Sequence, residues 1–208
     1  VVLVTSGPGA GNTVTGLMTA MMDSVPMLVI CGQTVTWMLG KDAFQEADIF
    51  GITIPVVKHN YLVKETNALP RIAREAYHIS TTGRPGPVLI DVPKDISQGP
   101  FTGDMNPPLQ LPGYHPEASK EICAKSVKQA ADLIAKAKRP VILAGGGASD
   151  AAAQIVALGE RLGAAMTASQ MGLGIVPTDH AQFIGHGGVI GGPAIAEALR
   201  GADVVLAL

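Results

Sequence analysis

The chain has 208 residues, with 15 basic and 17 acidic side chains and a formal net charge of −2. Hydrophobic residues make up 47% and charged residues 15%, which excludes a disordered chain, because such chains combine low hydrophobicity with high net charge. The balance of charge gives no support to nucleic-acid binding, which depends on clustered Lys and Arg. The length permits one large domain or two small ones.

Both ends of the chain have the pattern of buried strands, at residues 1–5 and 203–208, and there is no initiator Met. We therefore expect an internal fragment of a longer protein. Cys31 and Cys123 are too few for a disulfide framework, and no Cys/His cluster has metal-ligand spacing. We expect both thiols to be reduced and mostly buried. No stretch approaches the ~18 apolar residues of a membrane span, so we expect a cytoplasmic protein, or an organellar one if a transit peptide has been lost.

The first part of the chain alternates short β-branched runs with helical stretches. Runs without internal polar alternation are typical of parallel strands that are covered on both faces. Strand–helix–strand order then predicts a doubly wound α/β layer. The expected strands are residues 1–5, 26–31 and 87–92, and the expected helices are residues 12–23 and 69–80.

Residues 99–120 hold several prolines and no periodicity, which predicts a linker. The α/β alternation restarts after it, so we expect two units, at residues 1–98 and 121–208, both of them incomplete. The second unit is expected to contain helices at residues 121–137, 150–162 and 194–200 and strands at residues 140–144, 164–168 and 203–208.

A glycine-rich loop at residues 6–12 follows the first strand and opens a helix. Open α/β sheets bind ligands at the carboxyl ends of their strands, which is where this loop lies. It is neither a P-loop nor a dinucleotide fingerprint, because the Gly-Lys-Ser/Thr signature and the third-glycine spacing are absent. From the residues alone, a tight structural turn and a ligand loop both remain open.

Three further glycine segments occur in the second unit, at residues 145–147, 172–174 and 185–188. Glycine lets the backbone come close to a ligand, and three such segments at one edge of a sheet favour a bound dinucleotide over chance turns. Ser149 or Asp150 is the expected N-cap of the helix that follows the first of them.

The charged residues give no nucleophile–base set and no carboxylate pair by spacing. Taken singly, those at residues 42–46, 58–60, 84 and 94–95 have the pattern of solvated loops. The residues alone therefore predict two nucleotide-binding-type α/β domains of a larger enzyme.

A series of motifs closely resembles the thiamine-diphosphate enzymes, and among them the acetolactate (acetohydroxyacid) synthase large subunits. Thr-Ser-Gly-Pro-Gly and Gly-Arg-Pro-Gly-Pro-Val occur across the superfamily, whereas Asp-Ala-Phe-Gln-Glu with Lys-His-Asn is more particular to the synthases. The resembling segments are residues 5–10, 12, 15–17, 23–26, 32–33, 42–46, 58–60 and 83–95.

The resemblance implies that residues 1–98 are the later half of the domain that binds the aminopyrimidine ring of thiamine diphosphate, and that residues 121–208 are most of a middle domain that holds FAD. The implied reaction decarboxylates pyruvate and transfers the hydroxyethyl group to a second 2-keto acid, in branched-chain amino acid biosynthesis. The relay glutamate would lie upstream of Val1, and the domain that holds the diphosphate and Mg²⁺ would follow Leu208. We therefore expect the 208 residues alone to be inactive, with no metal ligand among them.

The resemblance also assigns roles to single residues. Pro8 and Asn12 would approach the pyrimidine, Gln45 would face the reaction site and bind cofactor or substrate, and Lys94 would line the substrate entrance. Arg84 would reach FAD, where a guanidinium suits phosphate or flavin oxygens. The remaining expected FAD contacts are Gly145, Gly146, Gly147, Ser169, Gln170, Met171, Gly185 and His186.

The chain departs from the family pattern at Gly11, at residues 34–35, and in the flavin region at residues 169–171 and 185–188. These departures leave open a sister enzyme of the sulfoacetaldehyde acetyltransferase, oxalyl-CoA decarboxylase or pyruvate oxidase type. A non-catalytic nucleotide-binding module is a further alternative. The resemblance implies a homodimer or tetramer, with scope for a regulatory subunit, and neither a nucleic-acid nor a membrane partner.

Overall fold

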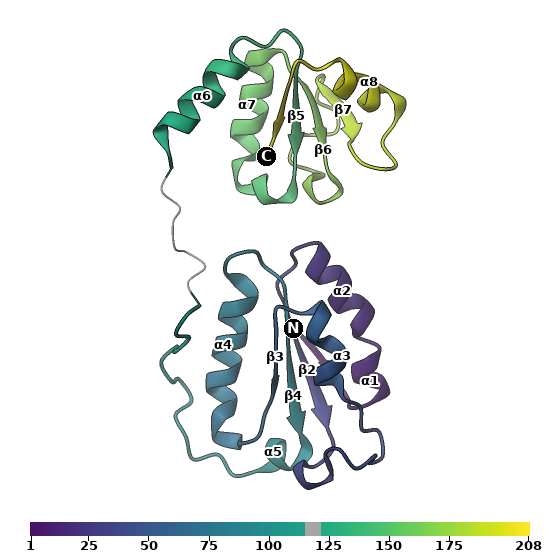
Figure 1. Ribbon diagram of the computed structural model, residues 1–208, viewed down its shortest axis with the longest axis vertical. Coiled ribbons are helices and arrows are strands. Elements are labelled where there is room, and N and C mark those ends of the chain that lie inside the picture. The colour runs from purple at the N-terminus through teal and green to yellow at the C-terminus, as the bar shows by residue number, and fades with distance from the viewer. Residues whose placement is uncertain (115–121) are drawn as a thin grey trace. The chain divides into compact units, whose positions relative to one another are not determined.

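The structure is a computed structural model that describes residues 1–114 and 122–208. The chain divides into two units, Val1–Lys120 and Glu121–Leu208 (Figure 1). The last part of the predicted linker, residues 115–120, and the predicted helix start at Glu121 lie outside the described residues.

The first unit is built on four parallel strands in the order β1-β2-β4-β3. Residues 87–93 are buried along the whole of the central strand β4, because helices cover it on both sides. The strands are β1 (Val2–Val4), β2 (Met27–Gln33), β3 (His59–Leu62) and β4 (Pro87–Pro93).

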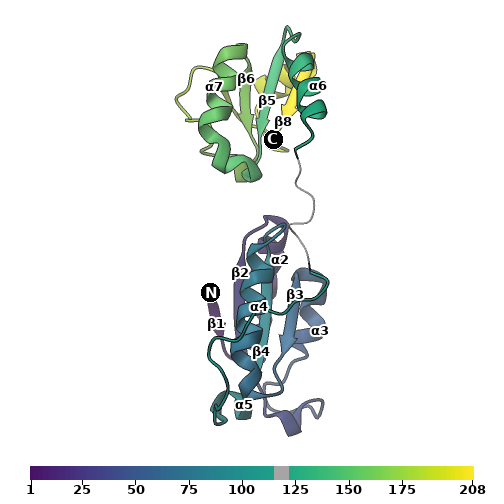
Figure 2. The ribbon, with the colours of Figure 1, turned by 90° about the vertical axis from the view of Figure 1, so that its left-hand side faces the viewer.

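Helices cover the two faces of this sheet separately (Figures 1 and 2). Val29 and Leu89 pack on one side with residues of α1 (Pro8–Gly11), α2 (Val14–Met22) and α3 (Ile49–Thr53), whereas Val88 and Ile90 pack on the other with α4 (Leu69–Thr81). Successive strand residues thus serve opposite faces. The short helices are η1 (Thr36–Met38), η2 (Ile54–Val56), η3 (Thr66–Ala68) and α5 (Lys94–Gln98).

The described part of the predicted linker, residues 99–114, lies against the first unit. Thr102 donates its backbone N–H to the Asn67 side chain at 2.9 Å. Leu111 and Tyr114 pack against the core beside α4. This stretch therefore contributes to the packing of the first unit although its sequence has no regular pattern.

The second unit also has four parallel strands, in the order β7-β6-β5-β8. Ile142 and Met166 are fully buried in its core, where they pack with residues of α7. Its elements are α6 (Ala124–Ile134), β5 (Pro140–Ala144), η4 (Gly146–Ala151), α7 (Ala152–Leu162), β6 (Ala165–Ala168), η5 (Gln170–Gly172), β7 (Phe183–His186), α8 (Pro193–Gly201) and β8 (Val204–Ala207).

The predicted fold class, two parallel-sheet α/β units, is confirmed. Strands β3 and β7 were not predicted. Cys123 was wrongly expected to be buried, because it precedes α6 and is exposed. The predicted N-cap at Ser149 or Asp150 is also wrong, since both lie inside η4 and Ala151 precedes α7.

Candidate functional site

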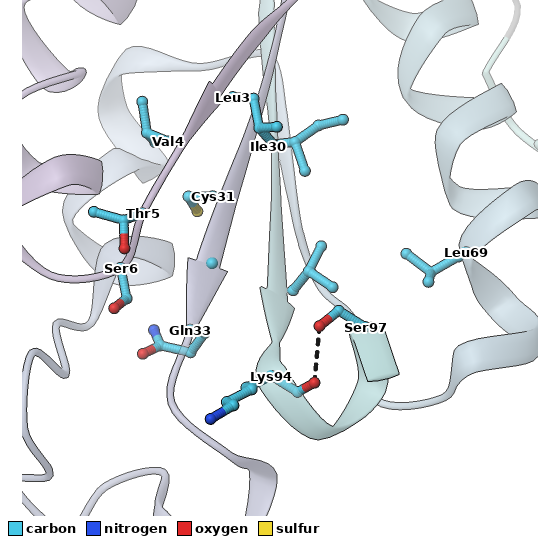
Figure 3. A pocket seen from close by; sticks show the side chains of 12 residues that line it. Leu3, Val4, Thr5, Ser6, Ile30, Cys31, Gln33, Leu69, Lys94 and Ser97 are labelled. Atoms are coloured by element: carbon cyan, nitrogen blue, oxygen red, sulfur yellow. Dashed lines mark hydrogen bonds between the residues drawn. The ribbon is translucent and has the colours of Figure 1, made fainter. Parts of the chain in front are cut away.

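A cavity of about 720 Å³ opens at the carboxyl ends of β1, β2 and β4 in the first unit (Figure 3). Thr5 and Ser6 border it after β1, Gln33 ends β2, and Lys94 follows β4. The backbone carbonyl of Lys94 accepts a 2.8 Å hydrogen bond from the Ser97 hydroxyl, which fixes the turn that presents the lysine. Lys94 is exposed, so the cavity has a cationic side chain at its border.

The loop that carries Gln45 lies against the first glycine loop. A Cβ on Gly7, whose φ is 55°, would lie 2.6 Å from the carbonyl oxygen of Gln45, so only glycine permits this approach. Pro8, Asn12 and Gln45 are all exposed. The structure therefore brings the segments that carry these predicted cofactor contacts together.

The loop that carries Gln45 has an unusual backbone conformation. Asp42 and Gln45 have φ values of 54° and 56°, a left-handed region that non-glycine residues seldom occupy. The Glu46 carboxylate holds the turn by accepting the backbone N–H of Ala43 at 2.8 Å and that of Gly40. These backbone hydrogen bonds, that from Ala43 foremost, lower the pKa of Glu46. Phe44, at the tip, is 89% exposed.

A buried carboxylate inside β4, near its carboxyl end, was not identified from the sequence. Asp91 is 1% exposed, and its pKa is raised to about 6, chiefly by burial, against the opposing hydrogen bonds from Gln33 and Cys31. The same burial, together with the negative charge of Asp91, raises the pKa of the Cys31 thiol far above its usual range. A polar residue inside an otherwise apolar strand is the sequence signal that could have identified it.

Residues 58–60, a motif of the resemblance, have structural roles. The Lys58 ammonium donates to the carbonyls of Ile79 and Thr82, at the end of α4. The Asn60 amide donates to the Phe50 carbonyl at 2.7 Å. The motif therefore ties β3 to the neighbouring helices.

Arg84 is exposed and bonded to the end of α2. Its Nε donates to Ser24 Oγ at 2.8 Å, and its Nη2 donates to the carbonyls of Met21 and Met22 at 3.2 and 2.8 Å. A cation at the carboxyl end of a helix is favourable for the helix dipole. The expected contact of Arg84 with FAD stays a prediction.

The glycine segments of the second unit follow parallel strands β5, β6 and β7, so they meet at one edge of the sheet. The first two pack closely against each other: a Cβ on Gly146 would lie 2.9 Å from Met171 Cβ, and one on Gly172 would lie 2.2 Å from the Ala144 carbonyl oxygen. Gly145 donates to the Leu208 carbonyl at 2.7 Å. At Gly147, by contrast, a Cβ would meet nothing within 4 Å. Open approach for a ligand therefore remains at Gly147.

The other expected FAD contacts lie on the same edge. Ser169 donates its backbone N–H to the Ala144 carbonyl, and the exposed Gln170 begins η5. Gly185, with a φ of 107°, precedes His186 at the end of β7. His186 Nε2 is buried and has no hydrogen-bond partner among residues 1–114 and 122–208.

No group of three or more His, Cys, Asp and Glu side chains among the described residues is placed to hold a metal ion. Likewise, none of the helices that the structure describes is long and apolar enough to cross a membrane.

Comparison with protein families gives two matches in chain order. Residues 1–52 match the family model described as "Thiamine pyrophosphate enzyme, N-terminal TPP binding domain", and residues 127–208 match "Thiamine pyrophosphate enzyme, central domain". The chain belongs to the thiamine pyrophosphate enzyme family. Its two sheets thus correspond to the family's N-terminal and central domains.

Curated relatives within this family match along the whole chain. It is 44% identical over 210 residues to an acetolactate synthase of Mycobacterium bovis, covering 34% of that protein. It is 43% identical over 210 residues to the acetolactate synthase large subunit of Lactococcus lactis and 46% identical over 215 residues to an acetolactate synthase of Arthrospira platensis, covering 36% and 37% of these. The chain spans about a third of the length of the relatives it matches.

Proposed function

We propose that the chain is part of an acetolactate synthase, which decarboxylates pyruvate and transfers the hydroxyethyl group to a second 2-keto acid. The observation that carries this proposal is the similarity to acetolactate synthases along all 208 residues, through both family domains. Because the chain spans about a third of those relatives, the activity is proposed for an enzyme of their length.

The first unit would contribute the pyrimidine side of the thiamine diphosphate site. Pro8 and Asn12 are exposed beside the loop of Gln45, so the three side chains are free to contact a ring. The Gln45 amide offers both donors and an acceptor to cofactor or substrate. Lys94, exposed at the border of the cavity, would attract the carboxylate of the 2-keto acid. When bound, the cofactor supplies the carbon nucleophile.

The second unit would hold FAD, and its residues fit a dinucleotide. Gly147 leaves open space for close approach, and the buried His186 Nε2 lacks a partner within the described residues. Gly145, Gly146 and Gly185 complete this glycine-rich end of the sheet, where Ser169, Gln170 and Met171 follow β6. Arg84, the cation that the resemblance implies for FAD, belongs to the first unit. Mg²⁺ would bind with the diphosphate, outside the residues described.

The test is to express the enzyme that carries this chain and to measure acetolactate formed from pyruvate with thiamine diphosphate, Mg²⁺ and FAD. Gln45→Ala is expected to lower the rate by about tenfold or more, the loss that follows from one hydrogen bond of 1–3 kcal/mol. The exposed Gln98→Ala is the matched control. No acetolactate with all cofactors present would refute the proposal.

A sister enzyme of the sulfoacetaldehyde acetyltransferase, oxalyl-CoA decarboxylase or pyruvate oxidase type is the second candidate. The feature that favours it is the departure of residues 169–171 and 185–188, in the expected flavin region, from the synthase pattern. The absorption spectrum of the purified enzyme distinguishes these readings in part, because the decarboxylase uses ADP where the synthase holds flavin.

We also propose a homodimer or tetramer in the cytoplasm, in which two subunits form the thiamine diphosphate site together. Light scattering at increasing protein concentration tests the assembly, and a monomer that is fully active would contradict it.

A further inference from the structure

Asp91, buried in the first sheet, accepts hydrogen bonds from two side chains of the neighbouring strand β2. Its Oδ1 accepts from Cys31 Sγ at 3.3 Å and its Oδ2 accepts from Gln33 Nε2 at 3.1 Å. Cys31 and Asp91 are register partners on neighbouring strands, which places the carboxylate between the two donors. A hydrogen bond between buried groups is electrostatically stronger than one in water, because the local dielectric constant is low.

Gln33 connects Asp91 to the loop that carries Gln45. Its Nε2 also donates to the Ala47 carbonyl at 2.9 Å, while its Oε1 accepts the backbone N–H of Thr34 at the same distance. Gln33 is 6% exposed. It lines the large cavity with Lys94 and also a second cavity, of about 300 Å³, that Glu46 and Asp91 border. A side chain with every polar atom engaged has one orientation, and this one holds Ala47.

Ala47 lies two residues beyond Gln45, whose φ of 56° is unfavourable for a residue with a side chain. Such a conformation persists only where the surroundings over-determine it. On one side, Gly7 abuts the carbonyl of Gln45. On the other, the bond from Gln33 fixes the Ala47 carbonyl.

We propose that Gln33, oriented by Asp91, is a positioning residue, which acts through Ala47 to hold the loop that presents Gln45. Asp91 orients the Gln33 amide, Gln33 anchors Ala47, and the anchored loop keeps the Gln45 side chain at one place beside the first glycine loop. The catalytic consequence rests on the proposed function of Gln45, whereas the mechanical link does not.

Amide hydrogen exchange on the 208-residue chain tests the mechanical link. Gln33→Met keeps the size of the side chain and removes its polar atoms, so the backbone amides of Gly40, Ala43 and Glu46 are expected to exchange about tenfold faster, the factor that corresponds to 1.4 kcal/mol of lost protection. Amides of α4 serve as the reference for global opening. Equal acceleration in α4 and the loop, or none in the loop, would overturn the proposal.

Cys31→Ala is the matched control, because it removes the other donor to Asp91 and leaves the bond from Gln33 to Ala47 in place. We expect it to lower overall stability without selective acceleration of the loop. Selectively faster exchange of the loop amides in Cys31→Ala would mean that losing either donor to Asp91 loosens the loop. The hydrogen bond from Gln33 to Ala47 would then not be the cause.

Exchanging the amide and the carboxylate between positions 33 and 91 tests the two hydrogen bonds of Gln33, to Asp91 and to Ala47, separately. In the double variant Asp91→Asn, Gln33→Glu, the new amide donates to the new carboxylate, so their contact is restored with its polarity reversed. Glu at position 33 has no N–H for the Ala47 carbonyl. Stability is therefore expected to recover relative to Gln33→Glu alone while loop exchange stays fast. Recovery of loop protection as well would overturn the route through Ala47.

The catalytic consequence is tested by a double-mutant cycle in the enzyme that carries this chain. Gln33→Met is expected to lower the turnover of pyruvate about tenfold, but less than about twofold when Gln45 is already alanine. Equal losses in both backgrounds would overturn the action through Gln45. If Gln45→Ala alone leaves turnover unchanged, the proposed function of Gln45 fails, and the exchange result still decides the link.

Discussion

The ammonium of Lys58 lies 3.2 Å from the hydroxyl of Tyr114, although 56 positions separate the two residues. The same ammonium bonds the last carbonyls of α4, and the Tyr114 hydroxyl also lies 3.2 Å from the Thr82 hydroxyl. His78 packs edge-on against the Tyr114 ring with centroids 5.8 Å apart. One lysine thus closes the helix end and holds the segment that follows the first sheet.

Removal of the Tyr114 hydroxyl is expected to weaken this junction. Tyr114→Phe should lower the free energy of unfolding by about 1 kcal/mol, because it removes a partly buried hydrogen-bond partner while the ring remains. Urea unfolding measures the change. Tyr77→Phe is the control, since Tyr77 is 63% exposed. An equal effect of the two substitutions would contradict the role of the Tyr114 hydroxyl.

Gly7→Ala is expected to destabilise the first unit by roughly 2–4 kcal/mol, because the new Cβ meets backbone atoms and the residue keeps a positive φ. The nearest of those atoms, the Gln45 carbonyl oxygen, would lie at 2.6 Å. Gly11→Ala is the matched control in the same loop, since a Cβ there meets nothing within 4 Å. Thermal unfolding of both variants measures the difference, and a stable Gly7→Ala chain would refute the close approach.

The folding stability of the chain is expected to depend on the protonation of Asp91. Burial raises its pKa to about 6 from an ordinary value of 3.8, so between these values the folded state binds a proton that the unfolded state has released. The stabilisation is fully present below about pH 4 and is lost as the pH rises through about 6. Relative to Asp91→Asn, the free energy of unfolding should fall by roughly 2–3 kcal/mol across this window. A difference that is flat or rising in urea titrations would contradict the raised pKa.

In the second unit, Gly172 is expected to matter for stability and Gly147 for FAD binding. Gly172→Ala places a Cβ 2.2 Å from the Ala144 carbonyl oxygen and should lower the melting temperature by several degrees, in line with a loss of about 1–3 kcal/mol. Gly147→Ala meets no atom within 4 Å and should leave the melting temperature unchanged while weakening FAD binding in the enzyme. Flavin fluorescence titration measures the binding, and unchanged affinity in Gly147→Ala would argue against contact there.

The sequence predicts six of the eight strands that the structure describes and misses β3 and β7, for a physical reason. Residues of β4 are buried on both faces, so all of them except Asp91 are apolar. β3 begins with the exposed His59 and continues with the polar Asn60, and β7 contains Gly185 and His186, so neither has the short apolar run that identifies the other strands.

The candidate site could likewise be predicted from the sequence only in part. The glycine loops can be located in the sequence, because glycine at a strand end permits both a tight turn and a close approach of the backbone. The bond between Gln33 and Asp91 joins residues 58 positions apart, and no local pattern in either segment identifies the partner. Only the parallel register of β2 and β4 brings the two together.

The thiols of Cys31 and Cys123 differ in reactivity because their environments differ. Cys31 is fully buried and its thiol is bonded to Asp91, so the reactive thiolate is suppressed. Cys123 is exposed before α6, and hydrogen bonds from Ser126 lower the pKa of its thiol. A maleimide dye or spin label added to the unmodified chain should therefore attach at Cys123 alone, giving a single reporter at the start of the second unit without any substitution.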